Sequence, residues 1–296
     1  MRIINHKLDG VEFKPAYYTG PVITPEIVVL HDTAGRLTKG NSAAYLASKN
    51  SGEVSVHFVL ERDGTIIQLV PTNCRANHAG QSSFNGREWC NGFSIGIEIV
   101  NPGKMTTVAS GGYVASKGRA WWGEIFEAGD EYDIEYRHTP EHGEGVWMAY
   151  TDAQIEALFG LLAVLFRDVP TLKDITTHWY VSPGRKVDTN PLFPLDQIRA
   201  RVLGRDDPAD TAAEKGSAVP GDDDLMVWVE TPGDTLNLRR WPSFNPNVIA
   251  EIPNGAVVPV VRSGTFCNRK WHRVIYGGPA GWTLARHAVP IVFAKT

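Results

Sequence analysis

The sequence predicts an α/β or α+β domain followed by a small all-β domain. Up to residue 204, short apolar runs alternate with helical patterns, which is typical of layered α/β architectures. Residues 205–224 are acidic and almost without apolar side chains, and residues 225–296 contain only short β-branched runs. At 296 residues the chain is long enough for two domains of about 100 to 200 residues each. We predict domains at 1–204 and 225–296, joined by a flexible linker at 205–224.

Composition excludes several classes of protein. A hydrophobic fraction of 43% and a charged fraction of 21% are typical of a packed globular chain, and a net charge of -4 argues against a strongly basic nucleic-acid-binding protein. Three cysteines without a CxxC pair indicate neither a disulfide framework nor a thiolate zinc ribbon.

No segment of the sequence predicts secretion or membrane insertion. The N-terminus lacks the apolar stretch of a signal peptide, and the most apolar later stretch, 153–166, contains Gln154 and Glu156. We expect a protein made in the cytoplasm, with no nucleic-acid or membrane partner.

Apolar runs predict four strands in the first domain. They are Ile27 to Leu30, Val54 to Leu60, Thr65 to Val70 and Ser94 to Val100. Between the second and the third, Asp63-Gly64 predicts a tight hairpin turn, because glycine readily adopts the positive φ that such turns need.

Two helices and one insertion complete the first domain. Thr151 can cap a helix whose apolar residues, from Ile155 to Phe166, recur at helical spacing. A second helix is predicted from about Leu195 to Leu203, with Gly204 after its end. Pro102 to Tyr150 fits neither pattern, and its many Trp and Tyr residues argue against disorder, so we predict an insertion at the rim of a cleft.

The second domain is predicted to be a small barrel or sandwich. Its β-branched runs are Val227 to Val229, Leu236 to Leu238, Val257 to Val261 and Trp271 to Tyr276. Eight Lys or Arg against three Asp or Glu give residues 225–296 a net charge of +5, whereas the linker carries -5. The small second domain is therefore basic.

His31 directly follows the apolar strand IVVL and opens a loop of small residues. Ligands and catalytic groups favour such strand ends. Taken alone, however, His31 is better interpreted as an ordinary loop histidine.

The segment THWYVSPGRKVDTNP contains His178, Lys186 and Asp188 in a predicted loop. Ser182-Pro183-Gly184 must turn the chain, which can bring His178 and Asp188 to one point. An imidazole and a carboxylate together suit zinc, which takes three protein ligands in catalytic sites and leaves one position open for water. Lys186 could reach the same point, but the spacing equally allows Lys186 and Asp188 to be surface charges.

Glu98 stands between Ile97 and Ile99 in the strand SIGIEIVN. A carboxylate in such a strand is costly unless it is paired, so either a functional role or a buried salt bridge must explain it. A raised pKa in this setting suits a general base that works near neutral pH.

Five motifs in order resemble one family. The series IVVLHDTAG, VSVHFVLERDGTIIQLV, NHAG, SIGIEIVN and HWYVSPGRKVD resembles the zinc-dependent N-acetylmuramoyl-L-alanine amidases of the type shared with peptidoglycan-recognition proteins. The resemblance covers roughly residues 22–203 apart from the 102–150 insertion. It implies a mixed central sheet flanked by helices, and peptidoglycan as the substrate.

The resemblance also implies roles for particular residues. Zinc would be bound by His31, His178 and Asp188, while Glu98 would act as general base and Lys186 would stabilise the intermediate. The loop Asn77, His78 and Ala79 resembles the wall that binds substrate, although an ordinary polar loop explains it equally well.

Val56 departs from the family pattern, because some members carry a catalytic tyrosine at this position, and Glu98 must then carry the proton transfer. For His57 a role in the core or behind the ligands is favoured over metal binding. His138 and His142 have the spacing of a metal pair on a helix, but Pro140 argues against a helix and neighbouring glutamates favour a solvated loop, so we exclude both.

The C-terminal segment resembles bacterial domains of the Src-homology-3 (SH3) type. The match rests on Leu236-Asn237-Leu238-Arg239, the turn Pro253-Asn254-Gly255, Trp271 and Gly281-Trp282. The resemblance implies binding to the cell wall, where Trp241 and Phe244 could stack on sugar or peptide. We expect Trp271 and Trp282 to be core residues.

These observations predict a zinc amidase that cleaves the bond between N-acetylmuramic acid and L-alanine of the stem peptide. The alternatives are a non-catalytic peptidoglycan-binding protein without the metal, and a hydrolase that cuts a bond within the stem peptide. A complete set of ligands, base and lysine favours the enzyme. The wall-binding domain favours a phage endolysin released by another route over an enzyme that recycles wall fragments in the cytoplasm.

Overall fold

The computed structural model describes residues 1–108, 117–129, 131–203, 225–239, 248–266, 269–278 and 280–291. The chain divides into two compact units, Met1–Arg205 and Asp206–Thr296. Within the described residues, none of the helices has the length and apolar character needed to cross a membrane.

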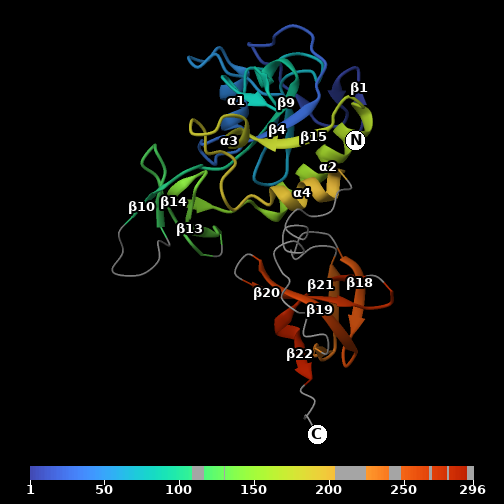
Figure 1. Ribbon diagram of the computed structural model, residues 1–296. Helices are drawn as coiled ribbons and strands as arrows, with labels where there is room; N and C mark the ends of the chain where they lie inside the picture. The colour runs from blue at the N-terminus through green and yellow to red at the C-terminus, as the bar shows by residue number, and fades with distance from the viewer. Residues whose placement is uncertain are drawn as a thin grey trace. The chain divides into compact units, whose positions relative to one another are not determined.

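A six-stranded mixed sheet forms the centre of the first unit, as the sequence predicted (Figure 1). Its strands, in spatial order, are β15 (Asp174–Thr177), β4 (Ile27–Asp32), β9 (Ser94–Ile99), β5 (Phe58–Leu60), β6 (Ile66–Gln68) and β3 (Glu12–Phe13). The first four run parallel, whereas β5 and β6 form the predicted antiparallel hairpin, with Gly64 at a φ of +84° in its turn. The carboxyl ends of β15, β4 and β9 therefore meet at one edge of the sheet.

Two helices cover one face of this sheet. Helix α2 (Asp152–Asp168) begins at Thr151 with a complete capping box, in which Thr151 and Gln154 bond each other's backbone N–H groups. Figure 1 shows α4 (Leu195–Leu203) beside α2, and both predicted helices are confirmed. Their apolar side chains pack with those of the strands, for example Leu158 against the cluster that contains Leu30 and Ile97.

Several short elements were not expected from the sequence. They are α1 (Asn41–Ala47), the helical turn α3 (His178–Val181), the 3-10 turn Cys90–Gly92, and the two-residue strand pairs β1 (Ile3–Ile4) with β2 (Lys7–Leu8) and β7 (Ser83–Phe84) with β8 (Arg87–Glu88). The loop predicted after Ile175 is thus one helical turn at its start, with His178 as the first residue.

The strand predicted from Val54 is shorter than expected, because only Phe58–Leu60 pairs in the sheet. The side chain of Asn50 bonds both the N–H and the carbonyl of Val54, and Ser55 donates its N–H to the carbonyl of Asn77. These local bonds replace a strand ladder over Val54 to His57.

The insertion is mostly β-structure, which its sequence did not reveal. It holds β10 (Thr106–Thr107), β11 (Lys117–Arg119) and β12 (Ile125–Glu127) in one sheet, and β13 (Ile134–Thr139) with β14 (Gly143–Met148) in a hairpin. These strands are short, and along β13 only Ile134 is fully buried, so no clear apolar alternation is present. Met105, Phe126 and Val146 lie in a small apolar cluster of its own.

The second unit is an antiparallel seven-stranded sheet. Its order is β18 (Val248–Pro253), β17 (Thr235–Arg239), β21 (Ala280–Leu284), β20 (Arg269–Ile275), β19 (Val257–Phe266), β16 (Met226–Val229) and β22 (Ala288–Ile291). Trp271 and Trp282 are buried, as expected, and Gly281 lies where a Cβ would meet the backbone of Arg239 at 2.8 Å. Trp241, Phe244, Gly204 and the predicted linker 205–224 lie outside the described residues.

Candidate active site

Parallel strands bring the predicted site residues together at one edge of the sheet. His31 and Glu98 are register partners on β4 and β9, so their side chains leave the same face of the sheet. His178 directly follows β15, the other neighbour of β4. Because β15, β4 and β9 are adjacent and parallel, residues distant in sequence lie at one point.

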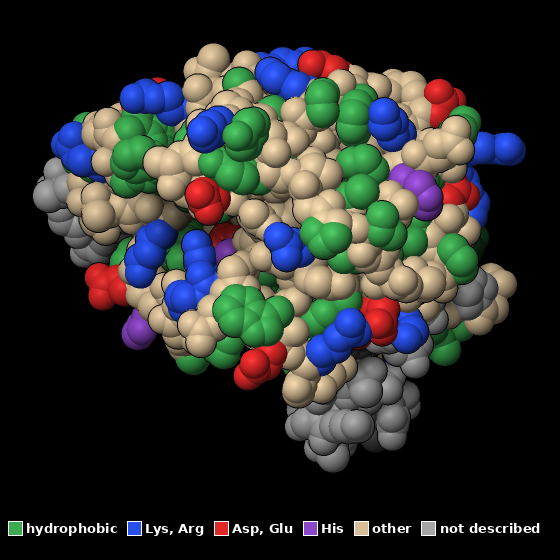
Figure 2. Space-filling model, turned by 90° about the horizontal axis from the view of Figure 1, so that it is seen from above, with side chains coloured by type: hydrophobic (Ala, Val, Ile, Leu, Met, Phe, Trp, Pro, Cys, Tyr) green, Lys and Arg blue, Asp and Glu red, His purple; other side chains and the backbone are tan. Residues whose placement is uncertain are grey.

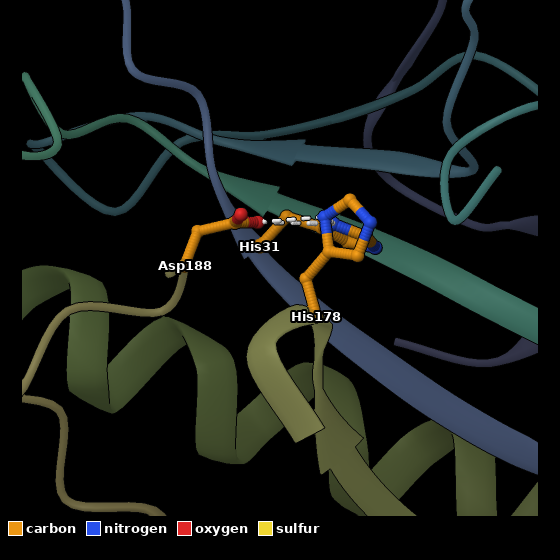
Figure 3. A group of neighbouring side chains, drawn as sticks. All are labelled: His31, His178 and Asp188. Carbon is orange, nitrogen blue, oxygen red and sulfur yellow. Dashed lines mark hydrogen bonds and ion pairs between the residues drawn. The ribbon is translucent and has the colours of Figure 1, made fainter. Parts of the chain in front are cut away.

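Three side chains converge in the arrangement that Figure 3 shows. The Nδ1 atom of His178 lies 2.9 Å from Nδ1 of His31 and 2.9 Å from Oδ2 of Asp188, and Nδ1 of His31 lies 3.3 Å from the same oxygen. One donor atom from each residue falls within 4.8 Å of the others. Two imidazole nitrogens facing each other beside a carboxylate form a donor set that suits a zinc ion.

The far side of each ring is held by a further partner. Nε2 of His31 lies 2.9 Å from Nδ1 of His78, and Nε2 of His178 lies 3.1 Å from the carbonyl oxygen of Ala79. Metal-binding histidines are usually fixed in this way, because the outer bond sets the tautomer and the ring orientation. His78 itself lies 3.2 Å from the hydroxyl of Ser94 and is buried.

These contacts place His78 and Ala79 behind the two histidines, while Asn77 is partly exposed. Contact of Asn77, His78 and Ala79 with substrate stays a prediction. The backbone N–H groups of His78 and Ala79 both bond the side-chain oxygen of Asn91, which fixes the loop.

Burial and neighbouring charges set the protonation states of the clustered side chains to those that bind a cation. Burial and the neighbouring charge of His178 lower the pKa of His31 to about 4, so its ring is neutral near neutral pH. Burial alone would raise the pKa of Asp188, but hydrogen bonds with His178 and His31 outweigh it and hold that pKa below its ordinary value. A neutral imidazole and an ionised carboxylate are the ligand forms that zinc binds.

Glu98 carries an unsatisfied carboxylate oxygen at this point. The residue is partly exposed, yet Oε2 is buried and has no hydrogen-bond partner among the described residues. Burial, and then the charges of Asp188 and Asp32, raise the pKa of Glu98 well above its ordinary value, while the charge of Lys186 opposes that rise. The charge of Lys186 also acts to lower the pKa of His31, so it influences both Glu98 and a proposed metal ligand.

The insertion contacts the loop that carries Asp188, which sequence reasoning missed. His142 was predicted to be solvated, but it is 7% exposed and its Nε2 lies 2.9 Å from the carbonyl oxygen of Thr189. Its Nδ1 lies 2.7 Å from the hydroxyl of Thr139. Thr and His three residues apart can bond across a turn, so this spacing was the sequence feature that could have indicated an ordered His142. His138 is exposed, as predicted, and the metal-ligating cluster found in the described residues contains neither histidine.

Asp32 fixes the same loop from the opposite face of β4. Its Oδ2 accepts the N–H of Asn190 at 2.9 Å, and its Oδ1 accepts the hydroxyl of Tyr150 at 2.5 Å. The amide of Asn190 also donates to the carbonyl of Met148 at 2.9 Å. Strand β4, the end of the insertion and residues 188–190 are thereby tied together.

His57 and Val56 serve the core, as the sequence suggested for His57. The Nδ1 atom of His57 accepts the N–H of Gly96 at 3.0 Å, and its Nε2 donates to the carbonyl of Cys74 at 2.9 Å. Val56 is fully buried in an apolar cluster with Leu69 and Val70.

A groove opens beside the ligands. A cavity of about 310 Å³ is lined by residues 81–83, 88–89, 181–183 and 185. Arg185 donates from Nη2 to the carbonyls of Ala79 and Gln81, at 2.7 and 2.8 Å. Figure 2 shows a hollow on one face of the molecule, with acidic and histidine side chains at its floor and Lys or Arg side chains at its rim.

Comparison with known proteins identifies the family to which this fold and site belong. Residues 21–191, more than half of the chain, match the N-acetylmuramoyl-L-alanine amidase family Amidase_2. The chain belongs to this family.

Individual relatives match over the first unit. The 1,6-anhydro-N-acetylmuramyl-L-alanine amidase AmpD of Escherichia coli (strain K12) is 34% identical over 151 residues, which are 51% of this chain and 58% of that protein. The N-acetylmuramoyl-L-alanine amidase AmiD of the same strain is 27% identical over 187 residues, 60% of this chain and 54% of that protein. The chain thus spans less than two thirds of the length of these curated relatives. A crystal structure of a selenomethionine derivative of AmpD matches 69% of this chain and 99% of its own, at 27% identity and a TM-score of 0.46.

Proposed function

We propose that this chain is a zinc-dependent peptidoglycan hydrolase that cleaves the amide bond between the lactyl group of N-acetylmuramic acid and L-alanine of the stem peptide. The main support for this proposal is the convergence of ligand atoms from His31, His178 and Asp188 within 4.8 Å of one another. Next to them, an oxygen of Glu98 is buried without a hydrogen-bond partner among the described residues. Membership of the amidase family and the names of AmpD and AmiD support the same reaction.

His31, His178 and Asp188 would hold the zinc ion. When bound at such a site, zinc lowers the pKa of water toward about 7 and polarises a carbonyl group. The rest of the chemistry falls to this chain's own side chains.

Glu98 is the proposed general base. It removes a proton from the attacking water and later donates that proton to the leaving nitrogen of L-alanine, so the amide C–N bond breaks and a lactyl carboxylate and a free amine result. The raised pKa of Glu98 suits both steps, because the group must accept and then release a proton near neutral pH.

Lys186 is the proposed electrophilic partner. Its positive charge acts on both His31 and Glu98, which supports a role in stabilising the negative charge that develops on the carbonyl oxygen of the substrate. A fixed charge in a partly dry site stabilises the transition state more than it does in water.

Digestion of purified cell walls tests the reaction. Mass spectrometry should find new free N-terminal L-alanine and glycan that carries unsubstituted lactyl groups. Activity should disappear with a chelator and return with zinc. Products cut within the stem peptide would support the second kind of hydrolase, binding without any product would support a receptor, and full activity of metal-free protein would contradict the zinc assignment.

We further propose that residues 225–296 form an SH3-like domain that binds the cell wall. The support is the antiparallel seven-stranded sheet with its two buried tryptophans and the net charge of +5, which suits an anionic polymer. An appended wall-binding unit suits an enzyme that acts on intact wall, such as a phage endolysin, better than one that recycles small fragments.

A further inference from the structure

Trp121 is an exposed aromatic side chain that the proposed chemistry does not use. It lies in the turn between β11 and β12 and is 78% exposed, the highest value for a large apolar side chain among the described residues. Isolated exposed apolar residues are common, but a large ring held in place next to a reaction site indicates recognition.

The ring of Trp121 is fixed although it is exposed. Its Nε1 donates to the carbonyl oxygen of Ala34 at 2.7 Å, and its ring meets that of Trp122 edge to face at 5.7 Å. Trp122 is itself anchored, because its Nε1 donates to Glu124 at 2.6 Å and the guanidinium of Arg36 lies 5.7 Å from its ring. The only polar group of the Trp121 ring is therefore used internally, and the ring is preordered for contact with a ligand.

The carbonyl that holds Trp121 belongs to the loop that leaves the metal site. Ala34 is the third residue after His31, and three residues span about 11 Å at most, so this anchor lies close to the site. The loop is bound to the end of β9, since Thr33 donates its N–H to Ile99 at 3.1 Å and Gly35 donates to Asn101 at 3.3 Å. The position of Trp121 is thus coupled to the strand ends that carry His31 and Glu98.

We propose that Trp121 is a stacking platform for the glycan strand that continues from the muramic acid being cleaved. This inference rests on the proposed function and adds a sugar subsite to it. One face of a pyranose ring presents mainly C–H groups, which pack well on a flat indole. A ring without a free donor suits that apolar face and offers nothing to the carboxylates of a stem peptide.

The groove around Arg185 is more polar. Besides the exposed ring of Trp89 it offers a guanidinium, a carboxylate, hydroxyl groups and an amide, and its lining does not include Trp121. Because the substrate has an apolar-faced glycan and a charged peptide on the two sides of the scissile bond, two chemically different surfaces near one site fit its two halves.

The test compares two substrates with the full-length chain. The short substrate is N-acetylmuramoyl tripeptide with one sugar, and the long substrate is a glycan oligomer bearing the same peptide. Trp121→Ala should raise KM for the long substrate about tenfold and leave kcat/KM for the short substrate within about twofold. Trp121→Phe keeps a ring and should retain most of the affinity for the long substrate.

The controls separate the platform from folding and from the reaction itself. Tyr17→Ala removes another exposed aromatic ring, 61% exposed, and should change neither substrate. An unchanged KM of Trp121→Ala for the long substrate would overturn the platform, as would equal losses on both substrates, which would mean that the 33–35 loop had moved. If the wild-type chain cleaves neither substrate, the proposed function is wrong and the platform falls with it.

Discussion

His142 donates a hydrogen bond from Nε2 to the carbonyl oxygen of Thr189, over 2.9 Å. Thr189 directly follows Asp188, so a histidine from the insertion holds the backbone next to a proposed metal ligand. Because a carbonyl oxygen can only accept, Nε2 carries the proton, and Nδ1 is left to accept from the hydroxyl of Thr139.

We predict that His142→Ala weakens zinc binding. Loss of a partner behind a metal ligand typically costs about 10- to 100-fold in metal affinity, because the ligand is no longer held in place. Competition with a chromogenic chelator measures this directly and needs no substrate. His138→Ala, in the same hairpin but exposed, is the matched control and should bind zinc like the wild type; equal affinity in both variants would show that the insertion does not support Asp188.

Glu98→Gln should separate chemistry from metal binding. The amide keeps the size of the side chain but cannot accept the proton, so turnover should fall roughly 100-fold or more, as for the loss of a general base. Zinc content and melting temperature should stay near wild-type values, since Glu98 is not among the clustered ligands. Near-normal turnover would show that another group moves the proton. Val56, at the position of the catalytic tyrosine of some family members, cannot be that group, because its side chain is apolar and buried.

Lys186→Ala should lower kcat with little effect on KM. A charge that faces the developing oxyanion acts mainly in the transition state, and its removal should cost a few kcal/mol in the barrier, or about 100-fold in rate. Lys186→Arg keeps the charge and should recover part of the rate. If Lys186→Ala instead raises KM at constant kcat, the lysine binds the ground state of the substrate.

Much of this site could be predicted because its residues stand in short, ordered motifs. The apolar run before His31 indicated a strand end, and the isolated carboxylate of Glu98 in an apolar strand indicated a special role. These residues come together because β15, β4 and β9 pair in parallel. Local sequence patterns do not encode that pairing. The contact of His142 with Thr189 spans 47 residues and depends on the fold of the insertion, whose short strands gave no periodic signal.

Stability of the metal-free protein should fall as the pH falls from about 6.5 to about 4, through His57. Burial lowers the pKa of His57 to about 4 in the folded chain, from 6.5 when unfolded. Between these values the unfolded chain binds more protons, so the contribution of His57 is complete above 6.5 and is lost toward 4. Asp32 works in the opposite direction, because burial raises its pKa to about 8.

A comparison of variants separates the contribution of His57 to the pH dependence of stability from those of other titrating groups. Urea unfolding across this pH range should show a steeper loss in the wild type than in His57→Gln, by up to about 1.4 kcal/mol per pH unit. His138→Gln, an exposed histidine, should leave the slope unchanged. Identical slopes for the wild type and His57→Gln would show that the imidazole is protonated while buried.

The two units should fold and act separately. Each unit has an apolar cluster of its own, for example Leu30 with Leu158 in the first and Val227 with Val274 in the second. Residues 205–224 carry seven acidic residues and few apolar ones, so they offer little surface for docking the units together. Residues 1–204 alone should therefore melt cooperatively and cleave a small soluble muropeptide at the rate of the whole chain.

On intact cell wall the whole chain should be faster than residues 1–204. Residues 225–296 would hold the enzyme at the wall and raise its local concentration, an advantage that a small fragment in solution cannot provide. Rising salt should release residues 225–296 from sedimented wall, because exposed charges separated by more than about 8 to 10 Å are screened at physiological ionic strength. Equal rates of the two proteins on intact wall would remove the targeting role and leave the basic unit to bind some other partner.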